Sequence, residues 1–432
     1  MRRNSLNKRI LALALPAIVA NITTPLLSLV DVAIVGHLGS AVYVGAIAVG
    51  GSIFNMLYWL FSFLRFGTSG LTALSVGRGD DAEMRLTGLR SLLVAAALGL
   101  LLVLFQRPLS YVAFGLIDAG ESVRALAEVY FNVLIFGAPA VMMQYSLTGW
   151  FVGAQDTRTP MLVSLAINVI NIGVSLLLVY RFNLGITGVA AGTLLAQWAG
   201  CLLSLAFFAA RTRRIASSLR ALLNFSAIKR FFSVNLDVFL RTLCLIAVTV
   251  WFTRAGADNG SVILAVNTLL LQLFTLFSYF MDGFAFAAEA LCGKLAGARD
   301  FVALRACINR FMAWGIGVAL LFTALYALGG AAFLGLLTDD VAVISASAEF
   351  RLWGAAIPLA GFMAFTCDGI AIGLTRTRLM LLSMAFATAV FFLTWRLASP
   401  ALANHGLWLA FLLYLLTRGL LLSALLRRST RE

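Results

Sequence analysis

Apolar runs long enough to cross a membrane recur along the whole chain and leave no stretch for a soluble domain. A hydrocarbon core of ~30 Å needs about 20 apolar residues in a helix, and only 12% of this chain is charged. A soluble protein could not cover so much apolar surface with polar groups, so we predict an all-α polytopic membrane protein. Twelve transmembrane spans are expected, at residues 11–35, 45–69, 87–106, 124–149, 160–180, 186–209, 231–253, 261–291, 308–334, 346–370, 379–397 and 402–425.

The basic residues are unevenly distributed over this map. Of the 32 Lys and Arg residues, 23 fall on the side that holds both termini, five on the other side and four within spans. Positive charge accumulates on the cytoplasmic side of membrane proteins, so both termini are expected in the cytoplasm. The net charge of +14 is thus explained by topology, and we expect the lipid bilayer, not nucleic acid, as its partner.

The two halves of the chain repeat one another at a spacing of 220 residues. The sequence "GRGD" at residues 77–80 matches "GARD" at 297–300, and "GWFVGAQDTR" at 149–158 matches "GIAIGLTRTR" at 369–378. Two matches at one spacing, both at equivalent cytoplasmic ends, make coincidence a poor explanation. We therefore predict two lobes of six spans each.

The expected N-terminal lobe covers residues 1–210, the C-terminal lobe covers 231–432, and residues 211–230 form a cytoplasmic linker. An even number of spans gives both lobes the same orientation, with a pseudo-twofold axis along the membrane normal. Parallel repeats of this kind occur in transporters that rock about a central cleft. The arrangement predicts alternating access.

One carboxylate, Asp31, lies inside the first span. A charged acid near the bilayer centre costs at least about 2.5–3.5 kcal/mol, and such residues usually serve ion or proton pathways. Burial disfavours the charged form of a carboxylate, so Asp31 is predicted to take up and release a proton. It closes a polar stripe on one helical face, made of Asn21, Thr24, Ser28 and Asp31. Pro16 and Pro25 in the same span each remove a backbone hydrogen bond and permit a kink.

A second polar stripe lies on the fifth span. Its members, spaced by three or four residues, are Ser164, Asn168, Asn171 and Ser175. Two stripes in one lobe would line one aqueous cavity. The alternative is that these Asn, Ser and Thr side chains hold helices together, at about 0.6–2 kcal/mol per contact, and the sequence leaves both interpretations open.

The remaining intramembrane polar residues are expected to form neutralised networks near helix ends. Asp237 and Arg241 are spaced as an i, i+4 pair on the seventh span, and we expect them to compensate each other. The others are Arg65 and Arg351, and in the second lobe Gln272, Asp282, Glu289 and Asp368. No Walker motif, HExxH motif or other metal-binding pattern is found, so neither a metal nor a cofactor is expected.

Several segments together resemble the multidrug and toxic compound extrusion (MATE) family. These are "LPAI" at residues 15–18, "VDVAIVGHLG" at 30–39, "FLRFGTSG" at 63–70 and "DGFAFAAEA" at 282–290. The last two resemble the DinF-like branch in particular. The resemblance covers nearly the whole chain.

The resemblance implies a two-lobe transporter that expels cationic amphipathic compounds in exchange for protons or sodium ions. Asp31 corresponds to the acid that the family uses for proton coupling, and Pro16 to the proline at which the first helix bends. Asn171 and Thr193 correspond to polar residues of the same site. Where many relatives have "NIVLD", this chain reads "NIGVS", so Ser175 replaces a second acid.

We expect a monomeric, proton-coupled efflux antiporter of the bacterial inner membrane. Three alternatives are weighed against it. The first is a sodium-coupled antiporter. The second is a lipid or lipid-linked glycan flippase, which would need a deep cationic cavity, whereas the intramembrane basic residues are scattered (Arg65, Arg241, Arg351 and Arg418). The third is a membrane enzyme, for which no catalytic cluster is seen.

Overall fold

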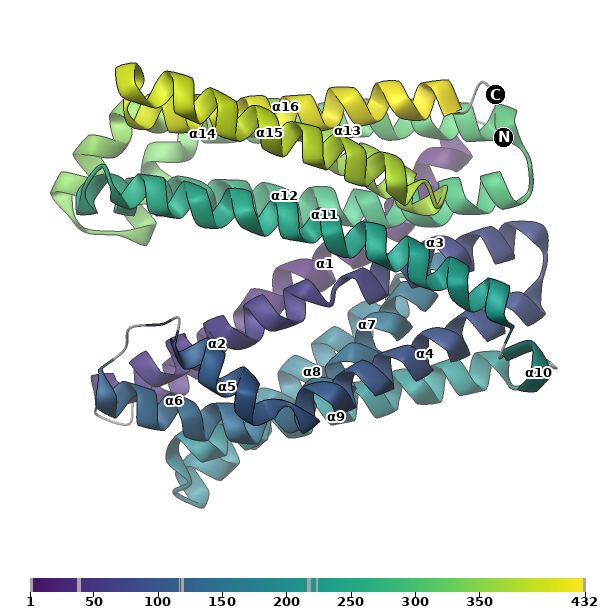
Figure 1. Ribbon diagram of the computed structural model, residues 1–432, viewed down its shortest axis with the longest axis horizontal. Coiled ribbons are helices and arrows are strands. Elements are labelled where there is room, and N and C mark those ends of the chain that lie inside the picture. Colours follow the sequence, from purple (N-terminus) through teal and green to yellow (C-terminus); the bar gives the residue numbers. More distant parts are fainter. Residues whose placement is uncertain are drawn as a thin grey trace. The chain divides into compact units, whose positions relative to one another are not determined.

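The computed structural model describes residues 3–36, 40–115, 117, 120–215, 219–222 and 224–429, and the secondary structure in these ranges is entirely helical. Figure 1 shows the helices in order along the chain. They are α1 (Arg3–Gly36), α2 (Ala41–Leu60), α3 (Phe63–Arg78), α4 (Asp81–Leu104), α5 (Gln106–Gly115), α6 (Glu121–Leu134), the 3₁₀ turn η1 (Ile135–Gly137), α7 (Ala138–Gly153), α8 (Arg158–Leu176), the π-helical turn η2 (Leu177–Arg181), α9 (Gly185–Thr212), α10 (Leu219–Leu222), α11 (Phe225–Ala257), α12 (Ser261–Gly297), α13 (Phe301–Leu337), α14 (Val341–Gly373), α15 (Thr377–Leu402) and α16 (Asn404–Ser429).

The prediction of an all-α protein with twelve spans is confirmed. The described residues contain 12 helical segments that are long and apolar enough to cross a membrane. Two of them are interrupted: α2 and α3 are separated at Phe61 and Ser62, and α6 and α7 at η1. The sequence analysis missed both interruptions, as well as the short helices α5 and α10.

The repeat predicted from the two sequence matches extends to the backbone. Gly79 (φ 69°) and Arg299 (φ 57°) both have left-handed conformations, and so do Gln155 (φ 67°) and Thr375 (φ 53°). Each pair is separated by the expected 220 residues. Left-handed backbone is strained for residues with a Cβ, so its recurrence at matched loops indicates a shared turn structure.

Glycines bring corresponding helices together in both halves. A Cβ built at Gly149 would lie 2.2 Å from the carbonyl oxygen of Arg65, and one at Gly369 would lie 2.5 Å from that of Ala285. These four positions again obey the 220-residue spacing. Since a methyl group would collide with backbone in each case, α7 can approach α3, and α14 can approach α12, only through glycine.

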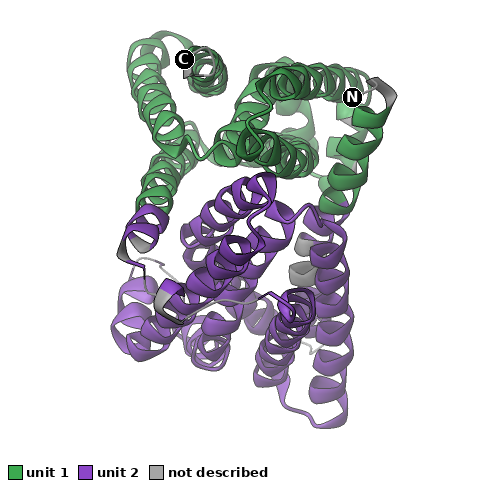
Figure 2. Cartoon of the chain, turned by 90° about the vertical axis from the view of Figure 1, so that its right-hand side faces the viewer, with its two compact units in different colours: residues 1–18, 233–432 green, residues 19–232 purple. Residues whose placement is uncertain are grey.

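The contacts divide the chain into two compact units, coloured in Figure 2: residues 1–18 with 233–432, and residues 19–232. The boundaries differ from the expected lobes in the placement of the first 18 residues. The reason is close packing of the first half of α1 on α12, because a Cβ at Gly283 would lie 2.3 Å from Cγ1 of Ile18. Pro16 lies two residues before the point where the chain passes from one unit to the other.

Candidate functional site

Asp31 is buried in the unit formed by residues 19–232, with 4% of its surface exposed. The hydroxyl of Thr193, on α9, lies 3.2 Å from its Oδ2. Asn171, on α8, donates to that same hydroxyl oxygen at 2.8 Å, and its amide also interacts with the carboxylate. The structure therefore brings together, from three helices, the three residues that the sequence analysis assigned to one site.

The hydroxyl of Thr193 cannot satisfy all of its neighbours at once. It accepts from Asn171 and has one proton, for which the Asp31 carboxylate (3.2 Å) and the Val189 carbonyl (3.1 Å) compete. The other carboxylate oxygen, Oδ1, accepts no hydrogen bond from a described residue. Asp31 also forms no ion pair within the described chain. A buried carboxylate whose donors, Thr193 and Asn171, are both neutral is poorly stabilised as an anion.

Ser175 lies beside this cluster, where many family members have an acid. Its side chain is buried and its Oγ has no hydrogen-bond partner among the described residues. It packs on Gly192, the neighbour of Thr193, because a Cβ at Gly192 would lie 2.2 Å from that oxygen. Asp31 is therefore the one carboxylate that the structure places in the cluster.

The two predicted polar stripes, on α1 and α8, also contact each other about two turns before Asp31. Thr23 lies 3.3 Å from the Ser164 hydroxyl, and its carbonyl accepts from Asn168 at 3.0 Å. The contact therefore uses Thr23, where the stripe pattern had pointed to Thr24. Asn21 is half-buried on α1. The side chains of Thr24 and Ser28 lie outside the part of the chain that the structure describes.

Two tyrosines near Asp31 were missed by the sequence analysis. Tyr130 is 4% exposed and its phenol lies near both Thr193 and Asp31. Tyr180, in the π-helical turn η2, donates to the carbonyl of Ile34 at 3.2 Å, one turn beyond Asp31. Each tyrosine could have been noticed as a polar group inside or at the end of a predicted span. The sequence spacing of these tyrosines, however, does not connect them with Asp31.

The other unit contains a separate buried ionic cluster. Asp368 on α14 accepts hydrogen bonds from Arg241 on α11 and Arg418 on α16. Asp282 on α12 adds a favourable interaction with Arg418. The predicted Asp237–Arg241 pair is not formed, because Arg241 turns to Asp368 and Asp237 instead accepts from the Thr377 hydroxyl at 2.8 Å. The prediction was wrong because it considered only partners on the same helix, whereas the actual partners lie on other helices.

The remaining predicted residues do not join these clusters. Gln272 and Arg351 are exposed, whereas Glu289 is fully buried on α12. Arg65 is buried on α3, with its guanidinium 3.9 Å from the centre of the Phe66 ring. No group of three His, Cys, Asp or Glu side chains within the described ranges could hold a metal ion.

The two buried aspartates have opposite electrostatic surroundings. Asp368 accepts charge-assisted hydrogen bonds from two guanidiniums. The described residues that contact Asp31, Thr193 and Asn171, are neutral. Of the two, Asp31 is the one without a countercharge among the described residues.

Comparison with known proteins identifies the family and supports the fold. The MatE family model matches residues 16–177 and 234–394. DNA damage-inducible protein F of Escherichia coli is 36% identical over 434 residues, covering 99% of this chain and 94% of that protein. The crystal structure of the Vibrio cholerae MATE transporter VcmN in the bent form superposes with a TM-score of 0.88 at 19% identity, covering 99% of this chain and 98% of that one.

A second solved structure, of a MOP superfamily transporter from Pyrococcus furiosus described as having a reverse polarity of its binding pocket, gives a TM-score of 0.88 at 18% identity. It covers 99% of this chain and 96% of that one. The structural likeness supports the fold, and the family model and the Escherichia coli relative support the membership. The relatives are transporters and not enzymes. The chain belongs to the MatE family of multidrug and toxic compound extrusion transporters.

Proposed function

We propose that this protein is a proton-coupled antiporter that exports cationic amphipathic compounds through the bacterial inner membrane, acting as a monomer with both termini in the cytoplasm. The observation that carries the proposal is the environment of Asp31. This buried carboxylate has no ion-pair partner in the described chain, its donors Thr193 and Asn171 are neutral, and Thr193 shares its proton with a backbone carbonyl. Such a carboxylate can be neutralised either by a bound cation or by a proton.

Competition between proton and substrate follows from this chemistry. Deprotonated Asp31 attracts a cationic compound, and protonation removes that attraction. When Asp31 is protonated, Thr193 loses its charged acceptor and its hydroxyl proton can turn to the Val189 carbonyl, 3.1 Å away. A proton entering from the more acidic side thus favours release of the cation, and linkage requires that bound cation lowers the proton affinity.

Movement of α1 would connect this site to alternating access. We infer that Pro16 serves as the bend, because it removes a backbone hydrogen bond close to the boundary between the two compact units. The expected lobes, residues 1–210 and 231–432, would then move so that the binding site opens in turn to the cytoplasm and to the outside.

Sodium is the second candidate for the coupling ion. Three buried oxygens of the cluster, on Asp31, Asn171 and Ser175, have no hydrogen-bond partner among the described residues. Oxygen ligands suit hard cations. The replacement of the second acid by Ser175 weakens this candidate, because it leaves one carboxylate to offset the charge of the ion.

Transport in proteoliposomes tests the proposal. A fluorescent lipophilic cation should move against its gradient when a proton gradient is imposed across the membrane and remain still under a sodium gradient alone. The Asp31→Asn variant should fold and retain its thermal stability, because a neutral amide of the same shape is cheaper to bury than a charge, but should not transport. Transport driven by sodium alone would replace the proton with sodium as the coupling ion.

A further inference from the structure

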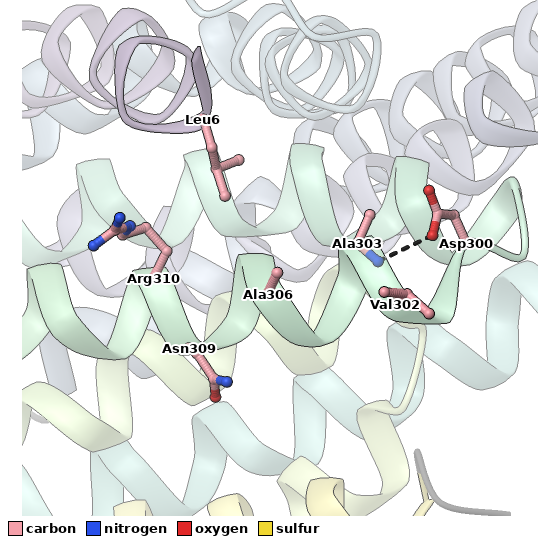
Figure 3. Close-up of a pocket in the computed structure, with 7 residues that line it drawn as sticks. All are labelled: Leu6, Asp300, Val302, Ala303, Ala306, Asn309 and Arg310. Atoms are coloured by element: carbon pink, nitrogen blue, oxygen red, sulfur yellow. Dashed lines mark hydrogen bonds between the residues drawn. The ribbon is translucent and has the colours of Figure 1, made fainter. Parts of the chain in front are cut away.

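A groove of about 550 Å³ lies between the start of α1 and the first turns of α13. Figure 3 shows Leu6 projecting from α1 toward α13, which carries the other lining residues. The apolar part of the lining is formed by Leu6, Val302, Ala303 and Ala306. Both walls belong to the same compact unit.

Arg310 contributes the positive charge of this lining. Its side chain is half-buried, and it forms no hydrogen bond or ion pair with any residue that the structure describes. A guanidinium near the end of a membrane span reaches the headgroup layer, where anionic lipid attracts it. The apolar lining and this cation together suit an amphipathic ligand with an anionic head.

The corresponding arginine of the other half, Arg90, has an anionic partner. Arg90 lies 220 residues earlier, and each arginine follows its helix-capping aspartate, Asp80 or Asp300, by ten residues. Arg90 is 6% exposed and fully engaged. It pairs with Glu83 at 2.6 Å and donates to the carbonyl of Ala221 at 2.7 Å.

None of these partners has a counterpart around Arg310. The position that corresponds to Glu83 is Ala303, and no linker helix equivalent to α10 covers the groove within the described ranges. The repeat retains the arginine in the second half, but within the described ranges it has no anionic partner there.

The carboxylate of Asp300, at the other end of the groove, does not repel an anion bound at Arg310. Asp300 accepts from the backbone NH of Ala303 at 3.0 Å as the cap of α13, so the positive end of the helix offsets its charge. Ten residues of helix, about 15 Å, separate it from Arg310. A headgroup bound at Arg310 therefore cannot place a second group on Asp300.

The surroundings favour a lipid over a soluble ion. At 37 residues, α13 is longer than the ~30 Å hydrocarbon core requires. Its two arginines, Arg305 and Arg310, both lie in its first three turns, so we expect this end in the headgroup layer. Trp314 donates to the Asn7 side chain at 3.3 Å near the groove, and tryptophans concentrate at this level of the membrane. The exposed neighbours Lys8, Arg9 and Arg299 add positive charge, which disfavours a headgroup with its own ammonium.

We propose that this groove binds one anionic phospholipid, with the lipid phosphate on Arg310 and an acyl chain along the apolar face of α13. Bound there, the lipid supplies in the second half the anionic partner that Glu83 supplies in the first. It also contacts the beginning of α1, the helix that carries Asp31. The inference depends on the groove alone and is independent of the coupling ion.

Native mass spectrometry of the full-length protein in detergent tests this directly. Dioleoyl phosphatidylglycerol should bind as one tight molecule, and dioleoyl phosphatidylcholine should bind at least about tenfold more weakly. Arg310→Gln should weaken phosphatidylglycerol binding by about tenfold or more, as expected for a lost charge-assisted hydrogen bond. Arg310→Lys should recover part of it.

Two further variants separate the groove from general charge. Ala306→Trp fills the groove at an exposed position and should abolish tight binding while leaving Arg310 in place. Arg378→Gln removes an exposed charge from the same unit outside the groove and should bind as the unmodified protein does. Equal binding by Arg310→Gln and the unmodified protein would overturn the inference, as would competition by millimolar inorganic phosphate or equal affinity for phosphatidylcholine.

Discussion

Replacing Gly192 by alanine should disrupt the Asp31 cluster while leaving each of its polar residues in the sequence. A Cβ at this position would lie 2.2 Å from Oγ of Ser175 and 2.9 Å from both its Cα and its backbone nitrogen. Ordinary contacts begin near 3.4 Å, so α8 and α9 must separate by about half an ångström. Overpacking of this kind costs about 1–3 kcal/mol.

The same displacement should stretch the contact that joins α8 to α9 in this cluster. Asn171 donates to Thr193 at 2.8 Å, and half an ångström more takes that bond to about 3.3 Å, beyond the usual range for an amide donor. Thr193 then loses the partner that orients its hydroxyl toward Asp31, 3.2 Å away. We therefore expect Gly192→Ala to lower the unfolding temperature modestly and to reduce proton-driven transport in proteoliposomes severely. Adding Ser175→Ala should not restore transport, because the Cα and nitrogen contacts remain.

Gly173, one turn from the site on α8, provides the matched control. A Cβ there would meet nothing within 4 Å, so Gly173→Ala should fold and transport normally, with any change in stability being favourable. Normal stability and normal coupling in Gly192→Ala would refute the argument. It would mean that α8 and α9 do not need this close approach.

Three further perturbations test other parts of the structure. Asp368→Asn should destabilise the protein by about 3–5 kcal/mol, because it leaves the two buried guanidiniums of Arg241 and Arg418 without a carboxylate. The unfolding temperature should fall strongly, and a fall no larger than that of Asp31→Asn would contradict this. Arg90→Gln should release α10 and speed tryptic cleavage at the exposed Arg213 and Arg214, whereas unchanged cleavage would show that Arg90 does not hold the linker. In a background without native cysteines, a cysteine replacing Arg213 should be labelled only from the cytoplasm and one replacing Asp339 only from outside, and the opposite result would invert the topology.

The fold was largely predictable because its main determinants are periodic. Span length and hydropathy identify twelve helices, and two short matches identify the repeat, since both signals are contained in contiguous sequence. The interruptions at Phe61 and at η1 were missed because both helix segments remain apolar across them. The placement of residues 1–18 was missed because it depends on packing of α1 on Gly283.

The site was predictable where polar side chains follow one helix face and not where partners come from several helices. Asp31 and Asn171 stand out as polar residues in apolar spans, and Thr193 was found only through family resemblance. Tyr130 was not found, because its proximity to Asp31 is created by the packing of α6. Arg241 was assigned the wrong partner for the same reason, since Asp368 lies 127 residues away in sequence.

Proton release on substrate binding tests the central claim most directly. Purified protein in weakly buffered detergent solution is mixed with a saturating cationic substrate, and the pH change is recorded over a range of starting pH. If substrate and proton compete for Asp31, about one proton should be released per bound cation at low pH. The release should fade as pH rises and Asp31 is already deprotonated, and substrate affinity should rise over the same interval. Asp31→Asn should bind substrate with no proton release and no pH dependence, and undiminished release from that variant would show that another acid carries the coupling.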